Sequence, residues 1–389
     1  MYGAGNHDEL EFEKTRDLEV MMPAPRIGSL VHPYRASMRR HLSSVATQSR
    51  PSILELLPPK RFVNRILFDL DSRLNYKKVI PVLDTIYQSI PSGKDPIIPK
   101  YATPDDLMLF QKALKEIRLK TRTENKYLLQ LENALVEKAA EAGQRDAVSI
   151  LAFTALKDQN NQFTDDDKAH AQKLIKELMK LKHPLAVKLT GDMLYQSNAL
   201  LEAEKMYLRF LELEKDTILS AEVHKSLGVI LFKDLRHFKA RAHFEKSIRL
   251  APLDKVYESH FYLSQLYSND DPLRSRHHLQ LSSSQGLRES LANLGFLELN
   301  YFKNVDVAFQ WFKLGAEITD ITSLIGLFDC YMLKKEYHEA VTILDRLKDT
   351  LTSDSYKDAI KAGTEKVTWE QLQSVRTKSL ETLSSLRLI

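Results

Sequence analysis

One stretch near the middle of the chain constrains the fold more than any other. Residues 221–253 read AEVHKSLGVILFKDLRHFKARAHFEKSIRLAPL. Gly228 and Ala240 are small enough for two antiparallel helices to touch, and Pro252 ends the second helix before another unit begins. The seam between the two helices would be filled by Leu227, Leu231 and Phe244. The stretch therefore predicts a helix–turn–helix unit.

Similar units recur along the second half of the chain. The positions equivalent to Gly228 are Gly191, Ser264, Gly295 and Phe328, and successive positions lie 37, 36, 31 and 33 residues apart. A period of about 34 residues is typical of tetratricopeptide repeats (TPRs). Residues 292–315 also show the Leu-Gly, Ala and Trp-Phe pattern of the shorter Sel-type repeat. With a degenerate first pair at Ala147–Leu181, the sequence predicts a TPR/Sel-like solenoid of five or six helix pairs over residues 146–350.

The segments around the repeats are also expected to be helical, which makes the fold class all-α. Residues 56–145 contain four amphipathic segments with no repeat, and we interpret them as a helical lead-in. Within this region, Thr103 is a predicted N-cap, with Asp105 and Asp106 in the first helical turn. Residues 351–389 hold two further helical segments, and Thr368–Leu388 is expected to cap the last repeat.

Composition limits the class of protein. Hydrophobic residues make up 43% and charged residues 28% of the 389 residues, which is typical of a globular protein, and only 12 glycines occur. A formal net charge of +4 is too small to indicate nucleic-acid binding. The single cysteine, Cys330, excludes a disulfide framework within the chain, and we expect a buried thiol without metal.

The amino-terminal segment divides into two parts of opposite charge. Residues 1–20 are acidic, whereas residues 21–55 have no Asp or Glu before Glu55 and hold five arginines among serines and small apolar residues. The second part has the composition of a mitochondrial transit peptide, and Arg39–Arg40 followed by Leu42–Ser43 resembles a matrix-processing site. The alternative is a disordered basic tail. We expect translation to begin at Met21 or Met22, so that residues 1–20 are an extension outside the natural protein.

No known catalytic or cofactor-binding pattern occurs in the sequence. Gly-rich phosphate loops, HExxH, paired Cys clusters and GxSxG are all missing. His277–His278 is interpreted as a solvated pair, because adjacent side chains on a helix point about 100° apart. His224 and His260 are expected to be packed or exposed, with contact to a peptide as the alternative. The run Asp165–Asp167 is interpreted as the start of a helix and not as a metal site.

The remaining candidates are surfaces. In a TPR-like stack the first helices of successive pairs line a groove, and aromatic, amide and lysine groups there suit an extended peptide. The predicted groove residues are Lys188, Asp192, Tyr195, Lys225, Phe232, Lys233, Phe261, Tyr262, Gln265, Asn269, Asn293, Phe296 and Asn300. The alternative is that the lysines are solvated and the aromatic residues belong to the core.

A second candidate surface is basic. It consists of Lys60, Arg61, Arg65, Lys77 and Lys78, interleaved with Phe62, Phe68 and Tyr76. Such a surface could contact an anionic membrane. An ordinary solvated face is the alternative. No apolar run reaches the length of a membrane span, so we expect a soluble or peripheral protein.

Two stretches resemble a known family. Residues 60–76 (KRFVNRILFDLDSRLNY) and 295–315 (GFLELNYFKNVDVAFQWFKLG) resemble fungal mitochondrial matrix proteins named for mitochondrial splicing suppression. The resemblance extends from about Pro58 to the C-terminal helices. It implies a non-enzymatic TPR-like protein, peripheral on the matrix side of the inner membrane. It also implies that the protein acts with the insertase machinery in exporting the C-terminal domain of cytochrome c oxidase subunit 2.

Three functional hypotheses follow. The first is a non-enzymatic assembly factor without cofactors or small-molecule substrates, whose partners are the insertase and the subunit 2 tail. The second is a general mitochondrial adaptor that scaffolds a translation or chaperone complex. The third is an enzyme within residues 56–145, for which no polar constellation can be named.

Overall fold

The computed structural model describes residues 50–389 except residues 94, 159–162 and 362–366. The acidic extension and nearly all of the predicted transit peptide lie outside these residues. The regular structure within the described ranges is entirely helical. The described residues form two compact units, divided between Ala186 and Val187. The predicted all-α fold is confirmed.

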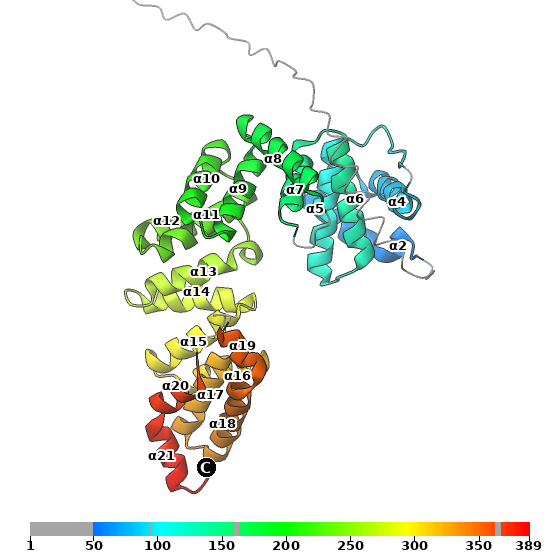
Figure 1. Cartoon of the computed structure of the whole chain (residues 1–389). Helices are drawn as coiled ribbons and strands as arrows, with labels where there is room; N and C mark the ends of the chain where they lie inside the picture. Colours follow the sequence, from blue (N-terminus) through cyan, green and yellow to red (C-terminus); the bar gives the residue numbers. More distant parts are fainter. Residues whose placement is uncertain (1–49, 94, 159–162, 362–366) are drawn as a thin grey trace, which may run out of the picture. The chain divides into compact units, whose positions relative to one another are not determined.

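The first unit is built from the helical lead-in and one helix pair (Figure 1). Consecutive long helices pack against one another from α5 to α8, and α4 packs on α6. The helices are α2 (Ile53–Leu56), α3 (Lys60–Asp69), α4 (Tyr76–Ser92), α5 (Pro104–Thr121), α6 (Lys126–Glu141), α7 (Arg145–Leu156) and α8 (Asp165–Lys180). The four segments expected before residue 145 correspond to α3–α6.

Two predicted helix starts are confirmed by their hydrogen bonds. The Thr103 side chain accepts from the Asp106 backbone N–H, and the Asp106 carboxylate accepts from the Thr103 backbone N–H. Thr164 and Asp167 form the same reciprocal capping box at the start of α8. Each box satisfies backbone donors that a helix leaves unpaired at its first turn.

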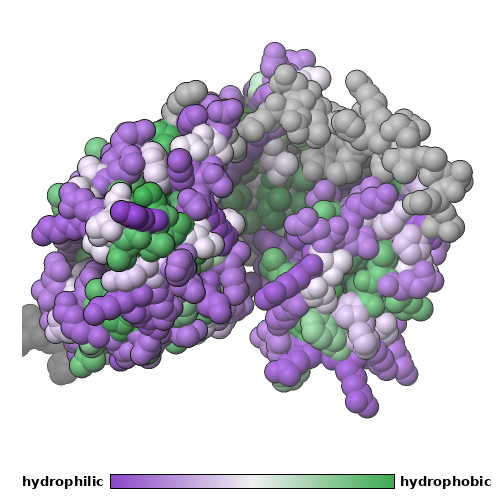
Figure 2. Space-filling view, turned by 90° about the horizontal axis from the view of Figure 1, so that it is seen from below, coloured by the Kyte–Doolittle hydropathy of each residue, from purple (hydrophilic) through white to green (hydrophobic). Residues whose placement is uncertain are grey.

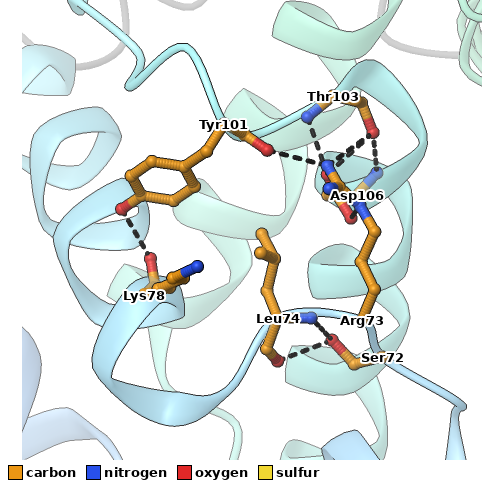
Figure 3. A network of polar contacts seen from close by, with 7 residues as sticks. All are labelled: Ser72, Arg73, Leu74, Lys78, Tyr101, Thr103 and Asp106. Atoms are coloured by element: carbon orange, nitrogen blue, oxygen red, sulfur yellow. Dashed lines mark hydrogen bonds and ion pairs between the residues drawn. The ribbon is translucent and has the colours of Figure 1, made fainter.

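An arginine ties the turn between α3 and α4 to the segment before α5 (Figure 3). Arg73 Nε donates to Asp106 Oδ1 at 2.9 Å, and Arg73 Nη2 donates to the Tyr101 carbonyl at 2.7 Å. The Tyr101 hydroxyl in turn donates to the Lys78 carbonyl at 2.9 Å. Burial raises the pKa of Asp106, but hydrogen bonds from Arg73 and Thr103 outweigh this and hold the pKa below its ordinary value. The network therefore fixes where α4 starts relative to α5.

The second unit stacks the remaining helix pairs in chain order (Figure 1). Its boundary falls within α9 (Pro184–Gln196). The helices that follow are α10 (Leu200–Leu213), α11 (Ile218–Lys233), α12 (His237–Leu250), α13 (Leu253–Tyr267), α14 (Pro272–Ser284), α15 (Arg288–Asn300), α16 (Val305–Glu317), α17 (Ile321–Lys334) and α18 (Tyr337–Thr352). With α7/α8 in the first unit, these make six helix pairs among the described residues, where the sequence predicted five or six.

Glycines allow the close approach within the pairs. The β-carbon of an alanine at Gly191, Gly228 or Gly295 would lie 2.7, 2.5 or 2.5 Å from the ring of Tyr207, Phe244 or Phe312. These rings are at most 1% exposed. Each ring therefore occupies the space that a side chain at the paired glycine would need. The role predicted for Gly228 is confirmed.

In the described part of residues 353–389, three helices follow the last pair, where the sequence predicted two. They are α19 (Asp354–Lys361), α20 (Trp369–Val375) and α21 (Thr377–Ser385). The predicted Thr368–Leu388 helix is divided at Arg376, whose backbone leaves the helical conformation. Arg376 binds the Asp329 carboxylate on α17 through two hydrogen bonds of 2.9 and 2.7 Å. Leu372 and Leu383 join the core of the last pair, so α20 and α21 cap the stack.

Candidate protein-binding groove

The predicted groove residues lie on the first helices α9, α11, α13 and α15 or just after them. None of the thirteen is buried, and Lys233, Asn269 and Asn300 are exposed. The first helices thus carry a row of side chains that reach solvent in four successive pairs. That these side chains form a peptide-binding groove stays a prediction.

A repeated ion pair joins neighbouring first helices. Lys188 on α9 lies 3.1 Å from Glu222 on α11, and Lys225 on α11 lies 2.9 Å from Glu258 on α13. Lys188 also contacts Asp192 at 3.0 Å. Burial lowers the pKa of Lys188, but the two carboxylates outweigh this and raise it. Lys188 is therefore charged, and both lysines already have acidic partners within the chain.

Asp192 also connects the two helices of its own pair. The Tyr207 hydroxyl on α10 donates to Asp192 Oδ1 at 2.8 Å. Burial, and then the charge of Asp192, raise the pKa of Tyr207 well above its ordinary value. Asp192 thus accepts from Tyr207 on one side and contacts Lys188 on the other. Asp192 therefore stabilises the packing of α9 on α10, in addition to being a predicted groove residue.

The aromatic groove residues are anchored in the core while their edges reach the surface. The Phe232 and Tyr262 rings lie 5.3 Å apart edge to face, and Tyr262 stacks on the buried Phe244 at 5.2 Å. The Tyr195 ring lies 5.3 Å from Lys233 Nζ. The half-buried rings therefore belong to the core, as the alternative expects, and also reach solvent, while contact with a peptide stays a prediction.

The histidines are arranged differently from the prediction in one respect. His277 is exposed, but His278 Nδ1 lies 2.9 Å from His260 Nδ1, so the interpretation of both as solvated was wrong for His278. The physical reason is the rotation between adjacent helical positions, which turns one ring outward and the next towards α13. His224 and His260 are buried, as expected. Among the residues that the structure describes, no group of three or more His, Cys, Asp or Glu could hold a metal ion.

Cys330 is fully buried on α17, as predicted. Burial raises the pKa of its thiol to about 12. A thiol in this environment is protonated at neutral pH and therefore a poor nucleophile.

The basic surface of the first unit is exposed at all five predicted residues, which lie on α3 and the first turn of α4. Arg61, Arg65 and Phe68 are spaced i, i+4, i+7 and share one face of α3, where Phe68 is 81% exposed. Lys60 Nζ lies 5.9 Å from the centre of the Tyr76 ring and joins the two helices. On the face drawn in Figure 2, hydrophobic side chains form patches among hydrophilic ones. No helix within the described ranges is long and apolar enough to cross a membrane.

These features define a class of protein, namely a helical-repeat protein of stacked antiparallel pairs with a separate helical unit before them. Residues 49–144 match the family model described as MSS2 N-terminal domain. The chain is 35% identical over 320 residues to "Protein MSS2, mitochondrial" of Saccharomyces cerevisiae (strain ATCC 204508 / S288c), over 80% of this chain and 91% of the yeast protein. The chain therefore belongs to the MSS2 family, which confirms the resemblance found in the sequence.

Two solved structures are also similar. YrrB, described as a TPR protein with an unusual peptide-binding site, is 17% identical with a TM-score of 0.38, over 49% of this chain and 97% of YrrB. Yeast Tom70 is 12% identical with a TM-score of 0.39, over 93% of this chain and 72% of the Tom70 chain.

Proposed function

We propose that this chain is a non-enzymatic mitochondrial helper protein that binds a polypeptide along its first helices. On this proposal it acts at the matrix side of the inner membrane, with the insertase machinery, in exporting the C-terminal domain of cytochrome c oxidase subunit 2. The observation that carries the proposal is the row of half-buried aromatic and amide side chains along α9, α11, α13 and α15. Membership of the MSS2 family, whose yeast member is named as mitochondrial, supports the location.

The groove would recognise its ligand mainly through rings and amides. Lys188 and Lys225 already contact carboxylates of the chain, so an acidic peptide would have to displace Glu222 and Glu258. Tyr262 and Phe232 need no such displacement, because their outer edges are accessible. Gln265 can bond to the backbone of an extended segment. The groove is therefore best suited to an extended segment with apolar side chains.

The basic surface would hold the protein at the membrane. Each Lys or Arg near an anionic lipid surface contributes about 1 kcal/mol, and an exposed ring such as Phe68 adds apolar contact. A set of five basic residues is enough for reversible binding without a spanning helix. Peripheral attachment would place the groove near the insertion machinery.

The second candidate function is a general adaptor for a translation or chaperone complex. The same groove favours it, since a peptide-binding surface does not by itself reveal whose peptide it binds. The two functions differ in what fails when the protein is missing. Loss of an adaptor would reduce several translation products together, whereas loss of an export factor would affect subunit 2.

The test deletes the gene in the source organism and follows newly made mitochondrial products, with protease access to both ends of subunit 2. The proposal expects the N-terminal end to cross while the C-terminal domain stays in the matrix. The Phe232→Ala variant should restore export less well than the wild type, whereas Phe309→Ala, a half-buried ring on the second helix α16, is the matched control. Normal insertion of subunit 2 with a joint loss of several products would establish the adaptor instead.

A further inference from the structure

Three second helices carry an exposed apolar side chain at the same position. Leu201 on α10, Phe238 on α12 and Leu273 on α14 are 67%, 80% and 67% exposed. Each lies two residues before the small buried residue of its helix, which is Ala203, Ala240 or Ser275 respectively. We call these three side chains the second-helix row. None of them belongs to the groove on the first helices.

Side-chain contacts connect the helices of the row. Arg236, just before α12, binds Glu204 on α10 through two hydrogen bonds of 3.0 and 2.6 Å. The Arg241 guanidinium lies 6.0 Å from the Phe238 ring. Arg241 on α12 and Arg274 on α14 both lie 5.6 Å from the Tyr267 ring. The row therefore lies on one continuous surface across three helix pairs.

The surface around the row is basic on two of its three helices. Helices α12 and α14 carry six Lys or Arg side chains and one acidic side chain, and three of the arginines already contact carboxylates, in the pairs Arg241–Glu245, Arg274–Asp271 and Arg276–Glu298. Helix α10 carries two basic and three acidic side chains, and Glu202, which directly follows Leu201, is exposed. Lys239 and Arg274, which directly follow Phe238 and Leu273 in the chain, are both exposed. An exposed apolar row with basic neighbours favours a ligand that is apolar on one side and acidic beside it.

The row ends after three pairs. The equivalent positions on α16 and α18 are Asp306 and His338, two residues before the buried Ala308 and Ala340. The position thus accepts polar side chains in this fold, so packing does not explain the three apolar ones.

We propose that the second-helix row binds an amphipathic helix of a partner protein, with an apolar stripe and acidic flanks. Packed helices lie about 8–10 Å apart, so three successive pairs span roughly 20 Å. A helix covers that length in about 13 residues at 1.5 Å per residue. A ligand helix of about four turns would reach all three side chains and place its carboxylates near the basic ones.

The test uses a labelled 16-residue peptide with leucines spaced i, i+3, i+7, i+10 and glutamates on the flanking positions. Fluorescence anisotropy measures its binding to the full chain. Phe238→Glu should weaken the binding at least 10-fold, and Leu273→Glu should do the same. His338→Glu, at the equivalent exposed position outside the row, should leave binding unchanged. A peptide with lysines in place of the glutamates should bind at least 10-fold more weakly than the acidic peptide.

Several results would overturn the proposal. The first is that the acidic peptide does not bind saturably. The second is that the wild type and both row variants bind it equally. The third is that the wild type binds the acidic and the basic peptide with equal affinity. If the wild type binds anionic phospholipid vesicles and Phe238→Glu does not, the row contacts lipid instead. If the wild type is a dimer and the same variant is a monomer, a second copy of the chain covers the row. Phe309→Ala, on α16 outside both the row and the groove, should bind the peptide normally.

Discussion

The Nδ1 atoms of His224 on α11 and His243 on α12 lie 2.8 Å apart. The same relationship recurs one unit later, where His260 on α13 faces His278 on α14 at 2.9 Å. At these distances one ring of each pair donates its Nδ1 proton and the other accepts it. Two protonated rings would both be donors and would repel each other. Each pair is thus stable only when at least one of its rings is neutral.

We therefore expect the protein to lose stability as the pH falls from about 6.5 towards 4. The pKa of His224, His260 and His278 is lowered to about 4 from an ordinary value near 6.5, and burial is the largest cause for each. Neighbouring positive charge contributes the rest, from His243 and Lys246 at His224, from His277 at His260, and from His260, His277 and Arg274 at His278. Between the two values the unfolded chain binds more protons than the folded one, so stability is complete above pH 6.5. The free energies of unfolding from urea titrations at pH 7.5 and 5.0 should differ by on the order of 2 kcal/mol per buried histidine.

The control separates these pairs from the other titrating groups. His243, the partner of His224, also has a pKa lowered first by burial and then by Lys246, while Glu204 acts in the opposite direction. Replacing His224 and His243 together by glutamine should reduce the difference between the free energies of unfolding at pH 7.5 and 5.0. His338→Gln, at an exposed position on α18, should leave it unchanged. An unchanged difference in the double variant would show that the first pair is not responsible.

Gly228→Ala should destabilise the protein although alanine favours helices. The added β-carbon would lie 2.5 Å from the buried Phe244 ring, and overpacking of this kind costs about 1–3 kcal/mol against a helix-propensity gain of about 1 kcal/mol. The net loss in the free energy of unfolding, measured with urea, should be about 1 kcal/mol and at most about 2 kcal/mol. The double variant Gly228→Ala/Phe244→Leu should lose less than the sum of the two single variants, because the leucine leaves room. Additive losses would contradict the proposed contact.

The repeat period made the packing predictable from the sequence, but not the polar contacts. Small residues such as Gly228 recur at the period and face large apolar ones, so their role follows from spacing alone. The pairing of His224 with His243 depends on how far two facing helices are rotated, which the spacing does not encode. The ion pairs are an intermediate case. Lys188 and Glu222 are 34 residues apart and Lys225 and Glu258 are 33 apart, so a search for opposite charges one period apart would have found them.

Asp106→Asn should destabilise the first unit through a change of charge alone. Asp106 is 5% exposed, accepts from Arg73 and closes the capping box with Thr103. An amide is neutral and donates at one of its two positions, so it weakens both contacts. We expect a loss of about 2 kcal/mol in the full chain, measured by urea unfolding with a probe in the first unit. Asp105→Asn, at the exposed neighbouring position, should lose less than about 0.5 kcal/mol.

Charge reversal on α3 should release the protein from anionic membranes. Arg61 and Arg65 are both exposed on the face that presents Phe68, so Arg61→Glu/Arg65→Glu replaces attraction by repulsion at the centre of the basic surface. At about 1 kcal/mol per basic residue, removing two of them should weaken binding at least 10-fold in a vesicle sedimentation assay. The charge-matched control Lys173→Glu/Lys176→Glu changes two exposed lysines on α8. If both double variants weaken binding equally, only net charge matters and α3 is not the contact. If neither does, the basic surface is an ordinary solvated face.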